Sequence, residues 1–151
     1  MSCRTVVVDC DWFVHDQHRL IKQLAFCDIK TNTSHLYKLT LPCCLAQYGA
    51  EFARQAERSH GLDWSEKGEY AFCRVDYVLS DIAERLGERQ GNICFWAEGG
   101  EKAAVLSDYG FSVKNLEKLG CPRFDQLTNE KQTTLLKAIV FAQWLGRYFH
   151  V

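Results

Sequence analysis

The sequence is short of the features that mark secreted, membrane-spanning and fibrous chains. It has two prolines in 151 residues and no repeat or low-complexity tract, which argues against fibrous and disordered classes. Its apolar runs are far too short to cross a bilayer, and "MSCRTVVVDCDWF" reaches charged residues too soon for a signal peptide. We therefore expect one intracellular domain over residues 1–151, cytoplasmic or nuclear, with no membrane partner.

An excess of positive charge is also missing. The formal net charge is −1, so the chain as a whole has no attraction for nucleic acid, and polyanion binding would need a local basic patch. Basic residues do concentrate in the last third, where acidic residues interleave with them. These are Lys102, Lys114, Lys118, Arg123, Lys131 and Lys137.

Disulfide signals are absent although the chain has eight cysteines. No CxxC pair occurs and most cysteines lie within apolar runs, which favours free thiols buried as small hydrophobic residues in a reducing compartment. Cys43 and Cys44 stand between Pro42 and Leu45, a setting that predicts burial rather than a reactive nucleophile.

Alternating and helical hydrophobic periods succeed each other along the chain. Three strands are expected first, at residues 4–13, 19–30 and 34–41. Helices are expected at residues 43–60, 74–88, 99–110 and 130–149, and two further strands at residues 92–97 and 111–116. The order βββ-α-α-β-α-β-α predicts an α/β fold, a mixed five-stranded sheet with a three-strand meander and helices on both faces. This is the element order of the ribonuclease-H-like fold.

The first strand carries two acids in "VVVDCDWFV". Residues two apart in a strand project from the same face, so Asp9 and Asp11 would present paired carboxylates. Such a pair suits a metal-binding strand, and it also suits a core strand that runs out into solvent.

The element order and this D-x-D resemble ribonuclease-H-like exonucleases of the DEDD type. The segments "KQLAFCDI", "SHGLDW", "ICFWAEGGEKAAVL", "VKNLEKLGCP" and "AQWL" are more closely similar to an uncharacterised set of arthropod proteins associated with transposons or viruses. The similarity covers most of the chain. It implies a nuclease centre of degenerate form.

In the DEDD family, carboxylates bind two divalent ions, magnesium or manganese, that drive phosphodiester hydrolysis. Asp9 and Asp11 match the first-strand acids, but lysines stand where further acids are expected, at Lys102 and Lys137. A lysine beside these carboxylates would pair with them and repel a divalent ion. Glu98 is a candidate substitute acid if the match between this sequence and the family's acid positions is shifted by a few residues.

The resemblance therefore implies a pseudo-nuclease that binds RNA, other single-stranded nucleic acid or a protein partner, in silencing, mobile-element or virus-host biology. The residues expected to bind are Lys102, Lys137, His60, Trp64 and Arg123. Two alternatives stay open: an active metal-dependent 3′–5′ exonuclease or other nuclease, and a viral or host protein–protein adaptor that binds no nucleic acid.

Two zinc sets are further alternatives, although no cofactor is the main expectation. Cys10, His15 and His18 have ligand chemistry that zinc accepts, and a surface turn explains them equally. His60, Cys73 and Cys121 are loosely similar to the zinc set of a degenerate ribonuclease-H-like domain of the piRNA pathway.

The segment from His60 to Trp64 has two readings as well. Trp64 beside His60 could stack on a base. Alternatively, Gly61 ends the preceding helix in a left-handed conformation and Leu62 and Trp64 hold the loop against the core, which is the reading that the sequence favours.

Overall fold

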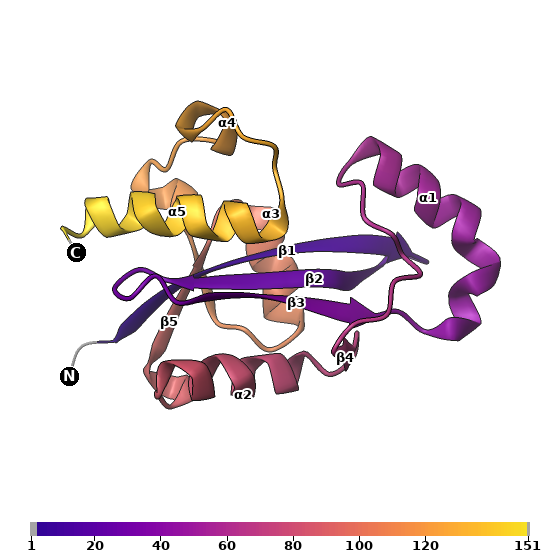
Figure 1. Cartoon of the computed structure of the whole chain (residues 1–151), viewed down its shortest axis with the longest axis horizontal. Coiled ribbons are helices and arrows are strands. Elements are labelled where there is room, and N and C mark those ends of the chain that lie inside the picture. Colours follow the sequence, from indigo (N-terminus) through magenta and orange to yellow (C-terminus); the bar gives the residue numbers. More distant parts are fainter. Residues whose placement is uncertain (1–2, 151) are drawn as a thin grey trace.

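Val6, Val7 and Val8 open the central strand of the molecule, and all three side chains are buried, because both faces of this strand are covered. The computed structural model describes residues 3–150 and has one six-stranded mixed sheet in the order β4-β3-β2-β1-β5-β6 (Figure 1). The strands are β1 (Arg4–His15), β2 (His18–Asp28), β3 (Ser34–Thr40), β4 (Tyr70–Ala71), β5 (Ile93–Ala97) and β6 (Val113–Asn115).

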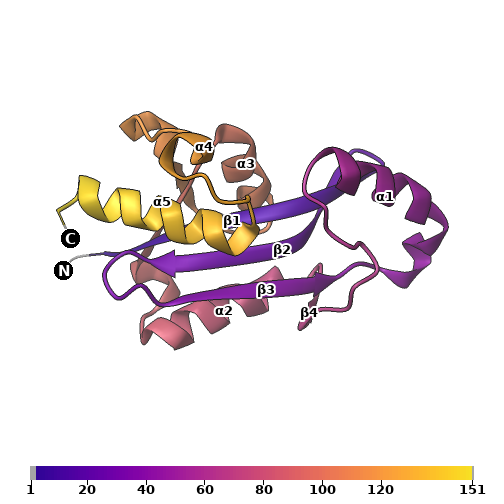
Figure 2. The ribbon, with the colours of Figure 1, turned by 45° about the horizontal axis from the view of Figure 1, so that its top comes forward.

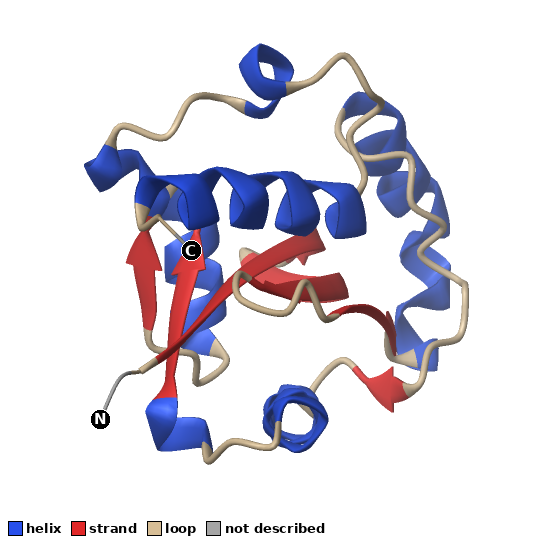
Figure 3. Ribbon diagram, turned by 60° about the vertical axis from the view of Figure 1, so that its left-hand side comes forward, coloured by secondary structure: helices blue, strands red, loops and turns tan. Residues whose placement is uncertain are grey.

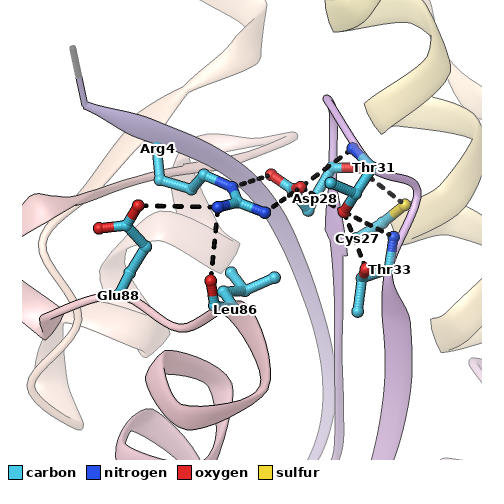
Figure 4. A network of polar contacts seen from close by, with 7 residues as sticks. All are labelled: Arg4, Cys27, Asp28, Thr31, Thr33, Leu86 and Glu88. Carbon is cyan, nitrogen blue, oxygen red and sulfur yellow. Dashed lines mark hydrogen bonds and ion pairs between the residues drawn. The ribbon is translucent and has the colours of Figure 1, made fainter.

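The first three strands form an antiparallel meander. The β1–β2 hairpin turns at Asp16 and Gln17, whose φ angles of 50° and 67° are the positive values that tight two-residue hairpin turns require. The turn between β2 and β3 is fixed by Asp28, which accepts hydrogen bonds from Arg4 and Thr31 (Figure 4). β5 then pairs in parallel with β1, and β6 in parallel with β5.

Alternate residues of β1 point to opposite faces, and each face is covered by different helices. The helices are α1 (Gly49–Arg58), α2 (Val75–Leu86), α3 (Gly100–Asp108), α4 (Phe124–Leu127) and α5 (Thr134–Tyr148), with 3₁₀ segments at Cys43–Tyr48, Gln90–Asn92 and Leu116–Leu119. Val6 and Val8 pack with α2 and α3, whereas Val7 packs with α5. Figure 3 shows α5 and α2 on opposite sides of the sheet.

A third, smaller core lies under α1 at the far end of the sheet, where Phe13, Leu20, Leu41 and Phe52 are buried together (Figure 2). Gly61, with a φ of 66°, follows this helix as the left-handed residue that its position predicts.

Leu62 and Trp64 pack against the small core under α1, as expected. The Trp64 ring lies so close to Gly49 that a Cβ there would stand 2.8 Å from it. The loop that follows α1 is therefore held down by apolar contacts.

The predicted count of five strands is wrong, because β4 adds a sixth at the edge. Glu69 and Phe72 donate backbone hydrogen bonds to the carbonyls of Lys38 and Thr40. Gly68 allows this close approach, since a Cβ at its position would lie 1.8 Å from the Lys38 carbonyl oxygen. A two-residue strand is too short to show alternation, so no sequence period could reveal it.

Two helix predictions also need correction. The helix predicted from residue 43 begins as the 3₁₀ segment Cys43–Tyr48, in which no residue is buried, so Cys43 and Cys44 are exposed rather than buried. The closing helix starts at Thr134 instead of residue 130, because the Thr133 hydroxyl caps it by accepting from the Leu136 amide. In residues 3–150 no helix has the length and apolar character needed to cross a membrane.

Candidate functional site

The carboxylates of Asp9 and Asp11 lie on the face of β1 that α5 covers, two and four residues beyond Val7 on the same side of the strand. The parallel register that pairs Val7 with Trp96 brings this part of β1 alongside the end of β5. α3 starts directly after that end and carries Lys102, while the first turns of α5 carry Lys137. Four separate elements therefore meet at the two carboxylates.

Asp9 forms an ion pair with Lys102. Its side chain is 1% exposed, and Oδ1 accepts a hydrogen bond from the Lys102 ammonium, whose side chain is 15% exposed. Burial raises the pKa of Asp9 to about 6, although the Lys102 and Lys137 charges oppose the rise. Burial would lower the pKa of Lys102, but the charge and hydrogen bond of Asp9 outweigh it and the pKa is raised. Each group thus depends on the other for its charged state.

The second carboxyl oxygen of Asp9, Oδ2, is buried and has no hydrogen-bond partner among the described residues. A buried carboxylate oxygen without a partner is costly. The hydrogen bond from Lys102 therefore satisfies only one of the two oxygen atoms of this carboxylate.

Asp11 is attached to the start of α5. Its Oδ2 accepts a hydrogen bond of 2.5 Å from the hydroxyl of Thr134, which also lies 3.1 Å from the amide oxygen of Gln23 on β2. Thr134 is 2% exposed, so this contact is shielded from water. The first residue of α5 is consequently fixed to two strands, and Lys137 follows it by one turn.

A cleft of about 290 Å³ opens beside Asp11, between the start of α5 and the strands β2 and β3. Three lysines from separate parts of the chain line it: Lys38, Lys131 and Lys137. Asp11 is the only carboxylate among the residues that line this cleft. Lys38 forms an ion pair of 2.7 Å with Glu66, which does not line the cleft. The cleft therefore has an excess of positive charge, which suits an anion such as phosphate.

Glu98, the candidate substitute acid, lies at the end of β5. Burial raises its pKa, Lys102 opposes the rise, and the Glu117 carboxylate adds to it. Within residues 3–150, however, no three His, Cys, Asp or Glu side chains are grouped so that they could hold a metal ion. Glu98 does not complete a carboxylate triad with Asp9 and Asp11.

The other residues expected to bind are placed differently. His60 lines the cleft, but Nε2 lies 3.0 Å from the Trp12 carbonyl oxygen and Nδ1 accepts from the Leu62 amide at 3.2 Å. Its ring also meets Phe13 edge-on, with the ring centroids 4.8 Å apart. The imidazole is thus fully used in holding the loop after α1.

Trp64 and Arg123 lie outside the cleft. Trp64 is half-buried against Phe52, with the ring centroids 5.8 Å apart. Arg123 is 75% exposed and lies 3.5 Å from the Asp125 carboxylate. The structure brings together Lys102, Lys137 and the two aspartates, and it leaves these two residues elsewhere.

The structure brings neither zinc set together. Cys10 is buried on the strand, whereas His15 and His18 face each other across the end of the hairpin. In the other set His60 already uses both nitrogens, Cys73 is exposed, and the Cys121 thiol contacts the Pro122 carbonyl. All eight cysteines are free.

Burial was expected for most of the cysteines. It holds for Cys10 and Cys27, while Cys94 and Cys121 are half-buried. The remaining four are exposed: Cys3, Cys43, Cys44 and Cys73. An apolar neighbour in the sequence does not bury a thiol that lies in a loop or a 3₁₀ turn.

Sequence reasoning missed several residues of this site. Thr134, Gln23 and Lys38 line the cleft, yet none of them belongs to a recognisable motif. Lys131, which also lines it, was named only as one of the basic residues of the last third. The one available signal was the alternation of β2, which places Gln23 on the same face as Ala25 and Cys27 and hence beneath α5.

The comparisons with known proteins add no assignment to this geometry. No protein-family model matches the chain, and no curated protein matches it either.

Proposed function

We propose that this chain is a ribonuclease-H-like pseudo-nuclease of one domain, a non-catalytic module that binds single-stranded RNA. The observation that carries the proposal is the ion pair between Asp9 and Lys102. It puts a lysine ammonium against the carboxylate that the active enzymes of this type would use to hold a metal ion. The binding surface is the cleft beside Asp11.

The sheet supports the proposed kinship. Apart from the edge strand β4, its order is β3-β2-β1-β5-β6. β2 runs antiparallel to β1 and β3, whereas β5 and β6 run parallel to β1. This is the arrangement expected when a three-strand meander is followed by two parallel strands joined by helices. Asp9 and Asp11 then lie in the middle of β1, just beyond the part that pairs with β5.

The donor set does not fit two divalent ions. Asp9 is paired with Lys102, Asp11 accepts from Thr134, and Lys137 adds a second positive charge close enough to influence Asp9. Magnesium and manganese need several converging oxygen ligands, and no such group of three acids exists in the described residues. We therefore derive no hydrolytic step.

The cleft supports the binding of a phosphate backbone. Lys137 in the first turn of α5 and Lys131 in the segment just before this helix both line the cleft, and Lys38 adds a third ammonium group from β3. Neither Lys131 nor Lys137 has a carboxylate within ion-pair distance among the described residues. When a lysine without an internal partner contacts a phosphate, it displaces the cations that the nucleic acid had condensed around that phosphate. The release of these cations favours binding and makes the affinity depend on the salt concentration.

An active nuclease is the second candidate, because the Oδ2 atom of Asp9 is buried without a partner. An oxygen in that state is available to a cation if Lys102 moves away. The decisive experiment incubates end-labelled single-stranded RNA and DNA with the purified protein and excess magnesium or manganese, the ions that a two-metal nuclease would need. We expect a mobility shift of the RNA and no shortened products.

Asp9→Ala is the control for contamination. Cleavage by the wild-type protein that disappears in Asp9→Ala would overturn the pseudo-nuclease proposal and establish the active nuclease. Absence of both cleavage and a salt-dependent shift would leave the protein–protein adaptor as the remaining class. An adaptor would then have to be demonstrated by binding to a defined protein partner.

A further inference from the structure

A groove separates the end of β1 from α1, next to the cleft that Lys38, Lys131 and Lys137 line; Ser59 lines both. β1 pairs with β5 only along Arg4–Val7, so beyond Val7 the described residues supply no strand to this edge of β1. The groove beside the free edge has a volume of about 1150 Å³ and is lined on one side by Trp12 and Val14 and on the other by α1. Figures 1 and 2 show α1 beside the end of the β1–β2 hairpin.

The free edge is closed by a side chain that imitates a peptide group. The Gln55 amide oxygen accepts from the Val14 amide at 2.8 Å, and the Gln55 amide nitrogen donates to the Val14 carbonyl at 2.7 Å. One carboxamide therefore makes both hydrogen bonds that a residue of a neighbouring strand would make. This geometry matches the recognition of a backbone and has no counterpart in phosphate binding.

The walls of the groove offer apolar surface next to this edge. Val14 is 42% exposed and Tyr48 is 39% exposed, the latter lying against His15 with ring centroids 4.4 Å apart. The groove is lined by two charged side chains of each sign, Arg54 and Arg58 with Glu51 and Asp16, and Arg54 pairs with Glu51 on the same helix at 2.8 Å. An uncharged, extended segment fits these walls better than a polyanion.

We propose that this groove binds an extended peptide of a partner protein, which pairs with the edge of β1 at Val14 and displaces the Gln55 amide. Addition of a strand to an exposed edge is an established mode of peptide recognition, in which backbone bonds give affinity and alternate side chains give specificity. Here one face of the added strand would contact Val14 and Tyr48. The groove shares only Ser59 with the cleft lined by Lys38, Lys131 and Lys137, and the proposal does not depend on RNA binding.

The test starts from a library of random ten-residue peptides displayed on phage, selected on the whole chain and counter-selected on Val14→Pro. Proline removes the amide that faces the groove, while the hydrogen bonds of β1 to β2 flank this position. The enriched peptides are synthesised with a fluorescent label and their binding is measured by anisotropy. We expect binding to the wild type and none to Val14→Pro.

Gln55→Ala is the informative variant, and Gln47→Ala is its matched control. Gln47 lines the same groove but makes no side-chain bond to β1. Because the peptide no longer has to displace two hydrogen bonds, Gln55→Ala should bind about tenfold more tightly, whereas Gln47→Ala should bind as the wild type does. Equal affinity of Gln55→Ala and wild type would overturn the proposal.

Two further measurements keep the result decisive. Hydrogen exchange of the Val14 amide in the wild type should become slower with peptide bound, and this reading does not require Val14→Pro to fold. Peptides methylated on alternate backbone nitrogens should lose binding. If no peptide is enriched over Val14→Pro, the peptide site is excluded.

Discussion

Lys102 and Asp9 stand 93 residues apart in the sequence, and the lysine ammonium donates a hydrogen bond to the aspartate carboxylate inside the protein. The pair joins the first turn of α3 to the central strand. The proposed function depends on this pair, because the Lys102 ammonium, which is covalently part of the chain, occupies one oxygen of the carboxylate.

Removal of one partner of this pair should cost more than removal of both. Lys102→Met leaves a buried carboxylate without its counter-charge, and we expect the free energy of unfolding to fall by about 3 kcal/mol. The double variant Asp9→Leu with Lys102→Met should recover to within about 1 kcal/mol of the wild type. Urea unfolding of the two single variants and the double variant measures the coupling. Additive losses would show that the two side chains do not act as a pair.

The raised pKa of Asp9 gives the stability a pH dependence with a definite sign. The folded protein holds this proton up to about pH 6, compared with 3.8 for an unperturbed aspartate, so it binds more protons than the unfolded chain does between these values. Protonated Asp9 therefore contributes roughly 3 kcal/mol to the free energy of unfolding. This contribution is fully present below about pH 4 and is lost as the pH rises through about 6.

Asp9→Asn checks this prediction, because asparagine does not titrate. The difference in unfolding free energy between wild type and Asp9→Asn should change between about pH 4 and pH 6 and be constant from there to about pH 9. A constant difference throughout the acid range would mean that Asp9 titrates at its ordinary pKa.

The proposed RNA binding should depend on salt through the cleft that Lys38, Lys131 and Lys137 line. Lys131→Gln and Lys137→Gln should each weaken binding of single-stranded RNA and reduce the slope of log K against log salt by about 0.7. Lys30→Gln is the matched control, since Lys30 is exposed in the turn after β2, away from the residues that line the cleft. Equal slopes for all three variants would place the RNA on another surface.

Asp28 should be the carboxylate on which stability depends most at acid pH. It is 0% exposed and accepts bonds of 3.1 and 3.0 Å from Arg4 and one of 3.0 Å from the Thr31 amide (Figure 4). Burial alone would raise its pKa, but the bonds from Arg4 and Thr31 outweigh burial and lower it. Its contribution is therefore present above about pH 4 and lost as the pH falls through the lowered value.

Asp28→Ala tests this role, and we expect a loss of about 3 kcal/mol at neutral pH because Arg4 keeps a partly buried charge without its main partner. Asp125→Ala is the control, since Asp125 forms an exposed contact with Arg123 at 3.5 Å that should contribute almost nothing. Similar losses in both variants would contradict the assignment.

The amino-acid sequence by itself determined the local structure. Alternation in residues 4–13 places Asp9 and Asp11 on one face. Gly87 caps α2 in the left-handed conformation that only a residue without Cβ adopts readily, and Gly61 adopts this conformation three residues after α1 ends at Arg58. The spacing of apolar residues also predicted an α/β fold with helices between parallel strands. These features can be predicted because each depends on residues that lie only a few positions away in the sequence.

Only the tertiary structure decided what the side chains meet. The edge strand β4 forms because Gly68 lets the chain approach β3, the Gln55 amide reaches Val14 across 41 residues, and four elements converge on the two aspartates. Such contacts depend on how helices pack on the sheet, and a local hydrophobic period carries no information about which distant residue will fill a given position. The sequence groups Lys131 and Lys137 with other basic residues of the last third, but only the fold brings Lys38 beside them.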